Sequence, residues 1–345
     1  MKPNYSNIFF KRLISVYQKD KSTFWYNLNS SFLSDQFSLS GIPNRLRLGI
    51  ELMSLYLDFK KKSKEILNEF SAQRGINIGQ WKSNRKSYMN DAFPVFIFLA
   101  IWMDEMQLHH ITKKFDDIIK AGVLAVSGYG ILDYNLDDNQ SVQVEIITAN
   151  ALIAEFEHRC FSIFGFSETN ATILHKMRML FYDAEIKEKA CRFKKNPYQS
   201  DKPENCGAKG ANSVIPFMLC LSHLNKETLI DAYWKVFMCF GAAIQILDDW
   251  KDLDEDLEHG HYSFITIGFE NEINSKNLKS ISKALKSDIT IISKTYNAGI
   301  QQINIAKSTL NGLNDSTLLN LVEMVEKKFR QFYRQELKYD NEKMI

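Results

Sequence analysis

The chain contains an apolar helical run that becomes acidic within one turn. Residues 237–247 carry no charge, and six acidic residues follow within nine positions: Asp248, Asp249, Asp252, Asp254, Glu255 and Asp256. Residues four apart lie on one face of a helix, so Asp248, Asp252 and Asp256 are predicted to form a column of carboxylates, with Asp249 beside it. Such a column repels itself unless a cation lies between its members.

Two interpretations of this column are open. A run of charges is most often a solvated helix end. A hard divalent cation is the other explanation, because Mg²⁺ prefers oxygen ligands and often bridges carboxylates to a substrate phosphate. The acids continue an apolar helix without a break, and a second acidic cluster lies upstream. Both features favour the metal.

The second cluster ends another predicted helix, Thr112 to Asp138. The middle of this helix is uncharged and contains three glycines, Gly122, Gly128 and Gly130. Each glycine costs roughly 1 kcal/mol relative to alanine. Close packing of neighbouring helices, or room for a ligand, would explain them. The helix then becomes acidic at Asp133, Asp137 and Asp138.

Composition excludes several classes of protein. The net charge of +2 predicts no nucleic-acid partner. Five scattered cysteines without a CxxC pair argue against a disulfide framework or a zinc site, and fit a cytoplasmic protein. The longest apolar run, residues 93–103, is too short to span a bilayer, so it predicts a buried helix and no integral membrane segment.

Periodicity predicts a single all-α domain over residues 1–345, a bundle of ten or more helices around a central cavity. Six prolines and fifteen glycines in 345 residues are few, which favours helices over a turn-rich sheet. A loop or weak helix is expected at 72–91 and a loop at 196–210. Turns are expected at 38–43 and 311–312, and a helix-ending glycine at Gly260. The expected helices are 8–17, 44–70, 92–106, 112–138, 142–165, 170–195, 212–224, 226–257, 273–297 and 315–337.

Two inward helices with acidic ends suggest a particular chemistry. If both ends meet at one mouth, they form a polyanionic rim that binds Mg²⁺ ions above an apolar cavity. An allylic diphosphate fits both parts, because metal and basic side chains neutralise the departing diphosphate. The cation left behind requires a dry, aromatic cavity. The chain has 24 Phe, 14 Tyr and 5 Trp, which is compatible with such a cavity.

The segment Gly241–Asp252 resembles the second aspartate-rich motif of the class I isoprenoid synthases, the all-α group of isoprenyl diphosphate synthases and terpene cyclases. The spacing of Asp248, Asp252 and Asp256 also resembles the metal triad of the cyclases. The first acidic cluster, Asp133-x-x-x-Asp137-Asp138, stands where the family has its first motif, and is nearer the DxxxD of squalene and phytoene synthases. The resemblance covers residues 112–337 and implies the class I terpenoid synthase fold.

The resemblance also implies roles for individual residues. Lys209 resembles the diphosphate-binding lysine of prenyl synthases, and Arg330 with Tyr333 the Arg/Tyr pair of cyclases. Arg192 is a diphosphate sensor or a surface salt-bridge residue, and Lys251 is a further diphosphate ligand. The metal is Mg²⁺ in a cluster of three, with Mn²⁺ as an alternative. The implied metal ligands are Asp133, Asp137, Asp138, Asp248, Asp249, Asp252 and Asp256, of which Asp133, Asp248 and Asp252 are catalytic.

Two departures from the family bear on the reaction. Chain-elongating synthases follow the first motif with an arginine pair, where this chain has Asn-Gln-Ser-Val-Gln-Val at 139–144. Their basic site for a second diphosphate is only faintly resembled by Asn44-Arg-Leu-Arg47, which lies farther upstream. The prediction is therefore a terpene synthase that cyclises farnesyl or geranylgeranyl diphosphate. A prenyltransferase and a non-catalytic lipid-binding protein are the alternatives, and a homodimer is compatible with each.

Overall fold

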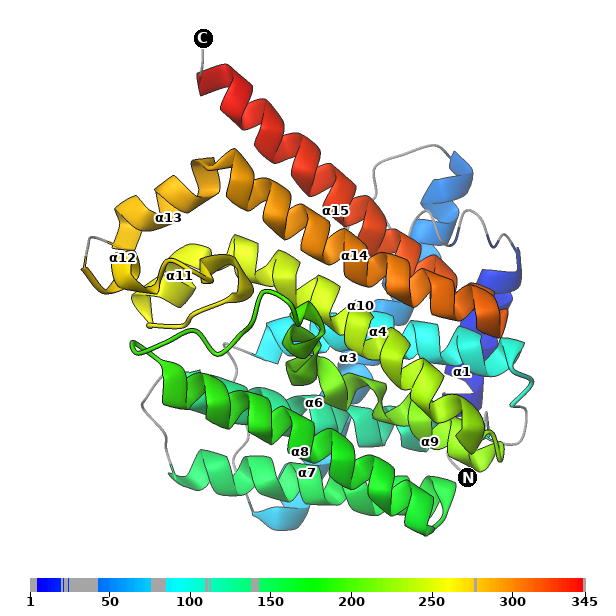
Figure 1. Ribbon diagram of the computed structural model, residues 1–345. Helices are drawn as coiled ribbons and strands as arrows, with labels where there is room; N and C mark the ends of the chain where they lie inside the picture. The colour runs from blue at the N-terminus through cyan, green and yellow to red at the C-terminus, as the bar shows by residue number, and fades with distance from the viewer. Residues whose placement is uncertain are drawn as a thin grey trace. The chain divides into compact units, whose positions relative to one another are not determined.

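In a computed structural model, every regular element among the described residues is a helix (Figure 1). This confirms the predicted all-α class. The chain divides into two compact units, Met1–Asn170 and Ala171–Ile345. The predicted single domain stays a prediction. The described residues are 5–19, 21, 24, 43–75, 85–108, 111, 113–137, 143–275 and 278–343.

The first unit is built from long helices around an aromatic core. The apolar run 93–103 lies in α4, and its side chains Phe98 and Trp102 are among the most completely buried, which confirms the predicted core helix. α4 begins earlier than expected, at Arg85. The helices are α1 (Tyr5–Lys19), α3 (Pro43–Arg74), α4 (Arg85–Glu105), α6 (Phe115–Asp137) and α7 (Gln143–Phe164).

Close helix packing explains two of the glycines in α6. A Cβ on Gly122 would lie 2.2 Å from the ring of Phe96 on α4. A Cβ on Gly128 would lie 3.0 Å from the carbonyl oxygen of Ala149 on α7. Both distances are shorter than most Cβ contacts in proteins, so the small residues let α6 lie directly against its two neighbours.

The second unit places α10 against α14, α15 and the 3₁₀ helix η2 (Figure 1). The predicted loop 196–210 is therefore partly helical, because η2 takes up its second half. The elements in order are α8 (Glu168–Cys191), η2 (Pro203–Val214), α9 (Ile215–His223), η3 (Glu227–Leu229), α10 (Ile230–Lys251), α11 (Leu253–Glu258), η4 (Phe264–Thr266), α12 (Glu270–Ser275), α13 (Leu278–Ser287), α14 (Ile289–Leu313) and α15 (Ser316–Lys343).

The acidic column spans a helix break. The expected helix 226–257 is interrupted at Asp252, whose φ of −91° and ψ of 7° end α10. The amide of Asp252 still donates to the carbonyl of Asp248 (2.9 Å), and that of Asp256 to the carbonyl of Asp252 (2.9 Å). The four-residue spacing of the column is therefore kept across the break.

Gly260 ends α11, as the sequence predicts. Its φ is +73°, a conformation that glycine adopts without strain. Its amide donates to the carbonyl of Leu257 (3.1 Å), and the amide of His261 reaches the carbonyl of Asp256 (2.7 Å). This pair of bonds is the Schellman arrangement of a helix C-terminus.

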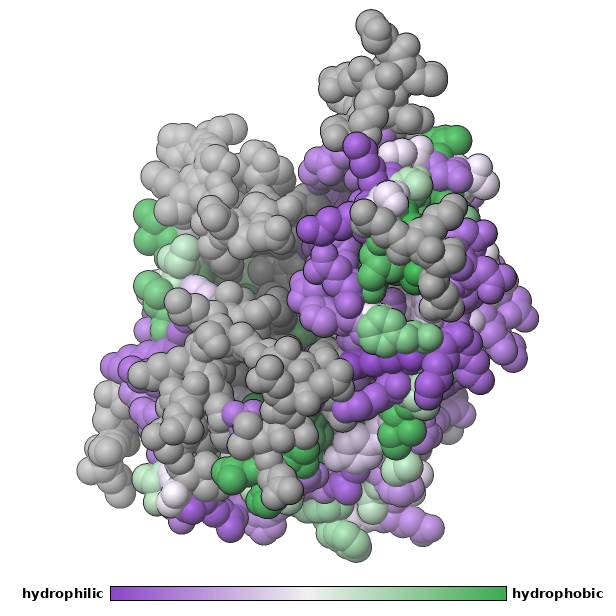
Figure 2. Space-filling view, turned by 90° about the vertical axis from the view of Figure 1, so that its left-hand side faces the viewer, coloured by the Kyte–Doolittle hydropathy of each residue, from purple (hydrophilic) through white to green (hydrophobic). Residues whose placement is uncertain are grey.

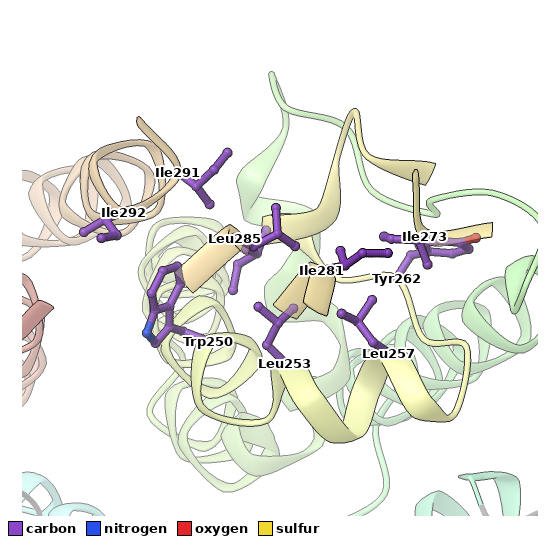
Figure 3. Packing of buried hydrophobic residues seen from close by; sticks show 10 residues of the cluster. Trp250, Leu253, Leu257, Tyr262, Ile273, Ile281, Leu285, Ile291 and Ile292 are labelled. Carbon is purple, nitrogen blue, oxygen red and sulfur yellow. The ribbon is translucent and has the colours of Figure 1, made fainter. Parts of the chain in front are cut away.

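Hydrophobic packing holds α11 in place beneath α13. Leu253 and Leu257 point toward Ile281 and Leu285, and Trp250 lies beside them at the end of α10 (Figure 3). Burying each leucine stabilises the fold by roughly 1.5–3 kcal/mol. Since the two leucines are four residues apart, they share one face of α11, and Asp254 next to Leu253 pairs with Lys286 of α13 (2.9 Å).

The other helix boundaries differ from the prediction near the C-terminus. The expected helix 273–297 is divided among three helices, and the last of them, α14, starts where Asp288 accepts a hydrogen bond from the Thr290 amide. The expected turn at Asn311-Gly312 lies inside α14, which ends at a left-handed Asn314. The turn predicted at 38–43 lies outside the described residues, apart from Pro43 in α3.

One helix among the described residues has the length and composition of a membrane span. It covers Glu227–Lys251, with a hydropathy of 1.3 in its most apolar window, 39% of which is buried. Core helices of soluble proteins meet the same criterion, so this is weak evidence. The expected lack of a membrane segment stays a prediction. On the face shown in Figure 2, the described surface is mostly hydrophilic, with hydrophobic residues in small separate groups.

Candidate functional site

The column of carboxylates lies on successive turns at the end of α10 and through α11. Asp248 and Asp252 are exposed, and Asp256 is half-buried. The predicted column is therefore present as a structural feature. That its members bind metal stays a prediction.

Asp249, next to this column, is buried, unlike Asp248 and Asp252. It is 5% exposed, and its carboxylate accepts hydrogen bonds from Gln245 Nε2 (2.8 Å) and from the amide of Phe264 (3.3 Å). Burial raises the pKa of Asp249 to about 7. Its carboxylate thus ties α10 to η4. One position along a helix turns a side chain by about 100°, which separates Asp249 from Asp248.

Two buried carboxylates that the sequence analysis missed lie on α8. The Nζ of Lys209 is 2.8 Å from Glu188 Oε2 and 3.5 Å from Glu185 Oε1. The side chains of Glu188 and Glu185 are only 8% and 4% exposed, whereas Ile186 between them is 66% exposed. Acidic residues at helical spacing are usually solvated, so only their i, i+3 spacing could have drawn attention to them.

Glu188 is the centre of a group of polar contacts from three further segments. In addition to Lys209 on η2, the Tyr198 hydroxyl donates to its Oε2 (3.2 Å). The Nδ1 of His261 lies 3.7 Å from its other oxygen and 3.8 Å from Asp256 Oδ1. α8, the following loop, η2 and the end of α11 therefore meet at one carboxylate.

This group carries more acidic than basic side chains. Burial, and then the charges of Asp249 and Glu188, raise the pKa of Asp256 to about 8, while the charge of Lys209 opposes that rise. Burial and the charge of Glu188 also raise the pKa of Tyr198. Buried carboxylates in such surplus favour uptake of a proton or a cation.

The close approach of Gly207 to α10 determines the position of Lys209. A Cβ on Gly207 would lie 2.3 Å from the Met238 carbonyl oxygen, and one on Gly241 would lie 3.3 Å from the Gly207 carbonyl oxygen. η2 and α10 therefore cross with their backbones almost in contact. Lys209 follows two residues after this crossing, on the side of the α8 carboxylates.

Arg192 lies directly after α8, beside the end of α11. It is half-buried, and its amide donates to the carbonyl of Glu188 (3.1 Å). The next residue, Phe193, donates its amide to the Gly260 carbonyl (3.1 Å), and its ring fills the space that a Cβ on Gly260 would need. The structure therefore brings Arg192 to the segment that carries His261. Its sensor role stays a prediction.

The remaining predicted diphosphate ligands lie on α10 and α15. Lys251 is exposed at the end of that helix. Arg330 is paired with Glu326 on its own helix (2.6 Å). Tyr333 stacks on Tyr296, with ring centroids 4.3 Å apart, and packs against the cluster that contains Trp250. None of these contacts tests a diphosphate role, which stays a prediction for all three.

The first acidic cluster belongs to the other unit. Asp133 is half-buried on α6, and Asp137 is the last residue of that helix. Asp138 lies outside the described residues, as do the side chains of Arg45 and Arg47. The predicted meeting of Asp133 with Asp248 stays a prediction.

The donor set suits Mg²⁺ in one specific way. Among the side chains described, no group of three or more His, Cys, Asp or Glu is arranged to hold a metal ion. The column nevertheless offers only carboxylate oxygens, which Mg²⁺ prefers. Mg²⁺ commonly takes one or two protein carboxylates and completes its shell with water and substrate phosphates. Asp248 and Asp252 fit an ion that arrives with a phosphate ligand.

Comparison with known proteins identifies the fold. No family model and no curated protein matches the sequence. The structure resembles a geranylgeranyl pyrophosphate synthetase from the archaeon Geoglobus acetivorans, with a TM-score of 0.53 and 16% identity, over 80% of this chain and 99% of that one. The chain therefore has an isoprenyl diphosphate synthase-like class I isoprenoid fold, which confirms the resemblance in the sequence at the level of the fold.

Proposed function

We propose that this protein is a Mg²⁺-dependent isoprenoid synthase that ionises an allylic prenyl diphosphate. The observation that carries the proposal is the carboxylate column of α10 and α11, which lies beside the buried group around Lys209. The fold, shared with a prenyl diphosphate synthase, supports the same class of chemistry.

The acidic side chains would bind metal, and the basic side chain of Lys209 would bind the diphosphate. Asp248 and Asp252, with Asp256 one turn farther on, would hold Mg²⁺, which neutralises the charge of the departing diphosphate when bound. Lys209 directs a fixed ammonium at the same anion, and such preorganised charge stabilises the state in which the leaving group carries most charge. The carbon–oxygen bond breaks with both electrons going to the diphosphate, which leaves an allylic cation for the next step.

The fold favours condensation of this allylic cation with a second substrate. The similar solved structure is named as a synthetase of geranylgeranyl pyrophosphate, which supports transfer of the allylic group to isopentenyl diphosphate. This reverses the order given by sequence alone. Cyclisation is the second candidate, because residues 139–144 lack the arginine pair of elongating synthases.

Product analysis separates the two reactions. The protein is incubated with Mg²⁺ and one ten-, fifteen- or twenty-carbon allylic diphosphate, with and without isopentenyl diphosphate. A longer diphosphate formed only with both substrates supports condensation, and a hydrocarbon from the single substrate supports cyclisation. No release of diphosphate from any substrate would contradict both.

Variants of the column test the assigned residues. We expect the double substitution Asp248→Asn and Asp252→Asn to reduce diphosphate release by at least ~10²-fold, because the metal-binding charge is lost. Asp254→Asn is the matched control, since Asp254 is an exposed acid in the same run that pairs with Lys286 on α13 (2.9 Å). It should retain activity within about twofold. Full activity in the double variant would contradict a metal-binding role for the column.

A further inference from the structure

We propose that Glu188 is a positioning residue, which holds the Lys209 ammonium in the direction needed to receive a diphosphate. The inference rests on the proposed function and adds to it a residue outside the aspartate-rich segments. It assigns a role to a carboxylate on α8 that would touch neither metal nor substrate.

The contacts around Glu188 support this role. A lysine ammonium has three donors on a flexible four-carbon stem, so by itself it has no fixed direction. Here Glu188 accepts at 2.8 Å, and Glu185 lies 3.5 Å from the same nitrogen. Both carboxylates come from one helix and are almost fully buried. Two anchors in fixed positions restrict the directions in which the ammonium can point.

The neighbours of Glu188 keep the carboxylate itself in place. The Tyr198 hydroxyl donates to the oxygen that faces Lys209, and His261 lies on the side of the other oxygen. Asn196 supports this arrangement from behind: its Oδ1 accepts from the Tyr198 amide (2.9 Å), and its Nδ2 donates to the Ser263 carbonyl (2.8 Å). The loop after α8 is thereby joined to the segment after α11.

Neutralising the charge of Glu188 changes diphosphate binding in opposite directions for its two possible roles. A buried ion pair is weak evidence for stability, so stability alone does not explain two glutamates here. A carboxylate beside an anion site repels the anion unless it acts by orienting a cation. If Glu188 only repels, its neutralisation tightens diphosphate binding. If Glu188 positions Lys209, its neutralisation weakens binding.

Calorimetric titration of inorganic pyrophosphate in the presence of Mg²⁺ tests this on the full chain. The proteins are the wild type, Glu188→Gln, Lys209→Met and the double variant. We expect Glu188→Gln to weaken pyrophosphate binding roughly tenfold, as for a lost charged hydrogen bond. The double variant should bind no more weakly than Lys209→Met, because Glu188 acts through Lys209.

Asp315→Asn is the control for loss of a buried carboxylate. Asp315 accepts from the Tyr233 hydroxyl (2.8 Å) near the opposite end of α10, so its substitution should lower the Tm and leave pyrophosphate affinity unchanged. Glu188→Asp is a second variant, which keeps the negative charge but shortens the side chain by one methylene group. We expect it to bind pyrophosphate more weakly than the wild type and more tightly than Glu188→Gln.

Each other outcome has a defined meaning. Unchanged or tighter binding in Glu188→Gln, unchanged binding in Glu188→Asp, or additive losses in the double variant would overturn the positioning role alone. A wild-type protein that fails to bind pyrophosphate with Mg²⁺ would overturn the proposed function and this inference with it.

Discussion

At the scale of single residues, Asp249 shows how one helical position changes the role of a carboxylate. Its neighbour Asp248 is exposed, whereas Asp249 is buried and receives two hydrogen bonds from the protein. Both oxygens thus have protein donors. Asp249 therefore ties α10 to η4, and its predicted metal-ligand role, like that of the exposed Asp248 and Asp252, stays a prediction.

The raised pKa of Asp249 predicts a pH dependence of stability. An unfolded aspartate titrates near 3.9, whereas burial raises the pKa of Asp249 to about 7 in the folded protein. The folded state therefore holds the proton more tightly. Its contribution to stability is complete below about pH 4 and is lost as the pH rises through 7. In divalent-free buffer, the unfolding free energy of the wild type should decrease between pH 5 and 8. In Asp249→Asn this decrease should be smaller by on the order of 2 kcal/mol.

Denaturant titrations of both proteins at several pH values measure this difference. The pH slope is the informative quantity, because an asparagine amide cannot accept both hydrogen bonds and is expected to lower stability at every pH. Equal slopes for the wild type and Asp249→Asn would show that this carboxyl does not titrate as the structure indicates.

The sequence predicted the acidic column but not the acids of α8. The column follows an uncharged helical run, and that contrast made it visible. Glu185 and Glu188 are surrounded in sequence by lysines, and the exposed Ile186 reverses the usual relation of polarity and burial. Their burial depends on Lys209 and Tyr198, which come from other segments, so no local pattern could reveal it.

At the scale of elements, the crossing of η2 over α10 determines where Lys209 lies. Gly207 allows the two backbones to approach, and the crossing is an arrangement between segments that periodicity does not encode. Residues 196–210, which include Gly207 and Lys209, were predicted to be a loop. The end of α11 was predictable because glycine is a residue type that ends helices, as Gly260 does. The start of α14 was not, because Asp288 lies inside a continuous helical pattern and acts through a side-chain cap.

Gly207→Ala should impair both stability and diphosphate binding. A Cβ there would lie 2.3 Å from a backbone oxygen that cannot move without bending α10. We expect a loss of about 1–3 kcal/mol in unfolding free energy and weaker binding of pyrophosphate with Mg²⁺, because Lys209 moves with η2. Thermal unfolding and pyrophosphate titration measure the two effects.

Gly210→Ala is the matched control on the same element. A Cβ on Gly210 meets nothing within 4 Å, so the substitution should be close to neutral for stability and binding. Equal behaviour of the two variants would show that the crossing at Gly207 does not determine the place of Lys209.

At the scale of the whole molecule, the fold was predictable because its signals are spread over hundreds of residues. Helical periodicity, few prolines and an uncharged core helix each indicated an all-α bundle, and the similar solved structure confirms that fold. The division into two units was not predicted, since no change of composition marks residue 170. Periodicity does not place the aromatic side chains that would close the predicted cavity and so limit the length of a substrate.

The central prediction from the sequence, that the two acidic helix ends share cations, stays a prediction. Chain cleavage by Fe²⁺ bound in place of Mg²⁺ tests this directly, because radicals formed at the ion cut only nearby backbone and Fe²⁺ also accepts carboxylate ligands. With pyrophosphate and ascorbate, we predict cuts near both residues 133–138 and residues 248–252, which disappear together in the Asp248→Asn and Asp252→Asn double variant. Cuts confined to residues 248–252, or cuts at residues 133–138 that persist in that variant, would contradict the shared site.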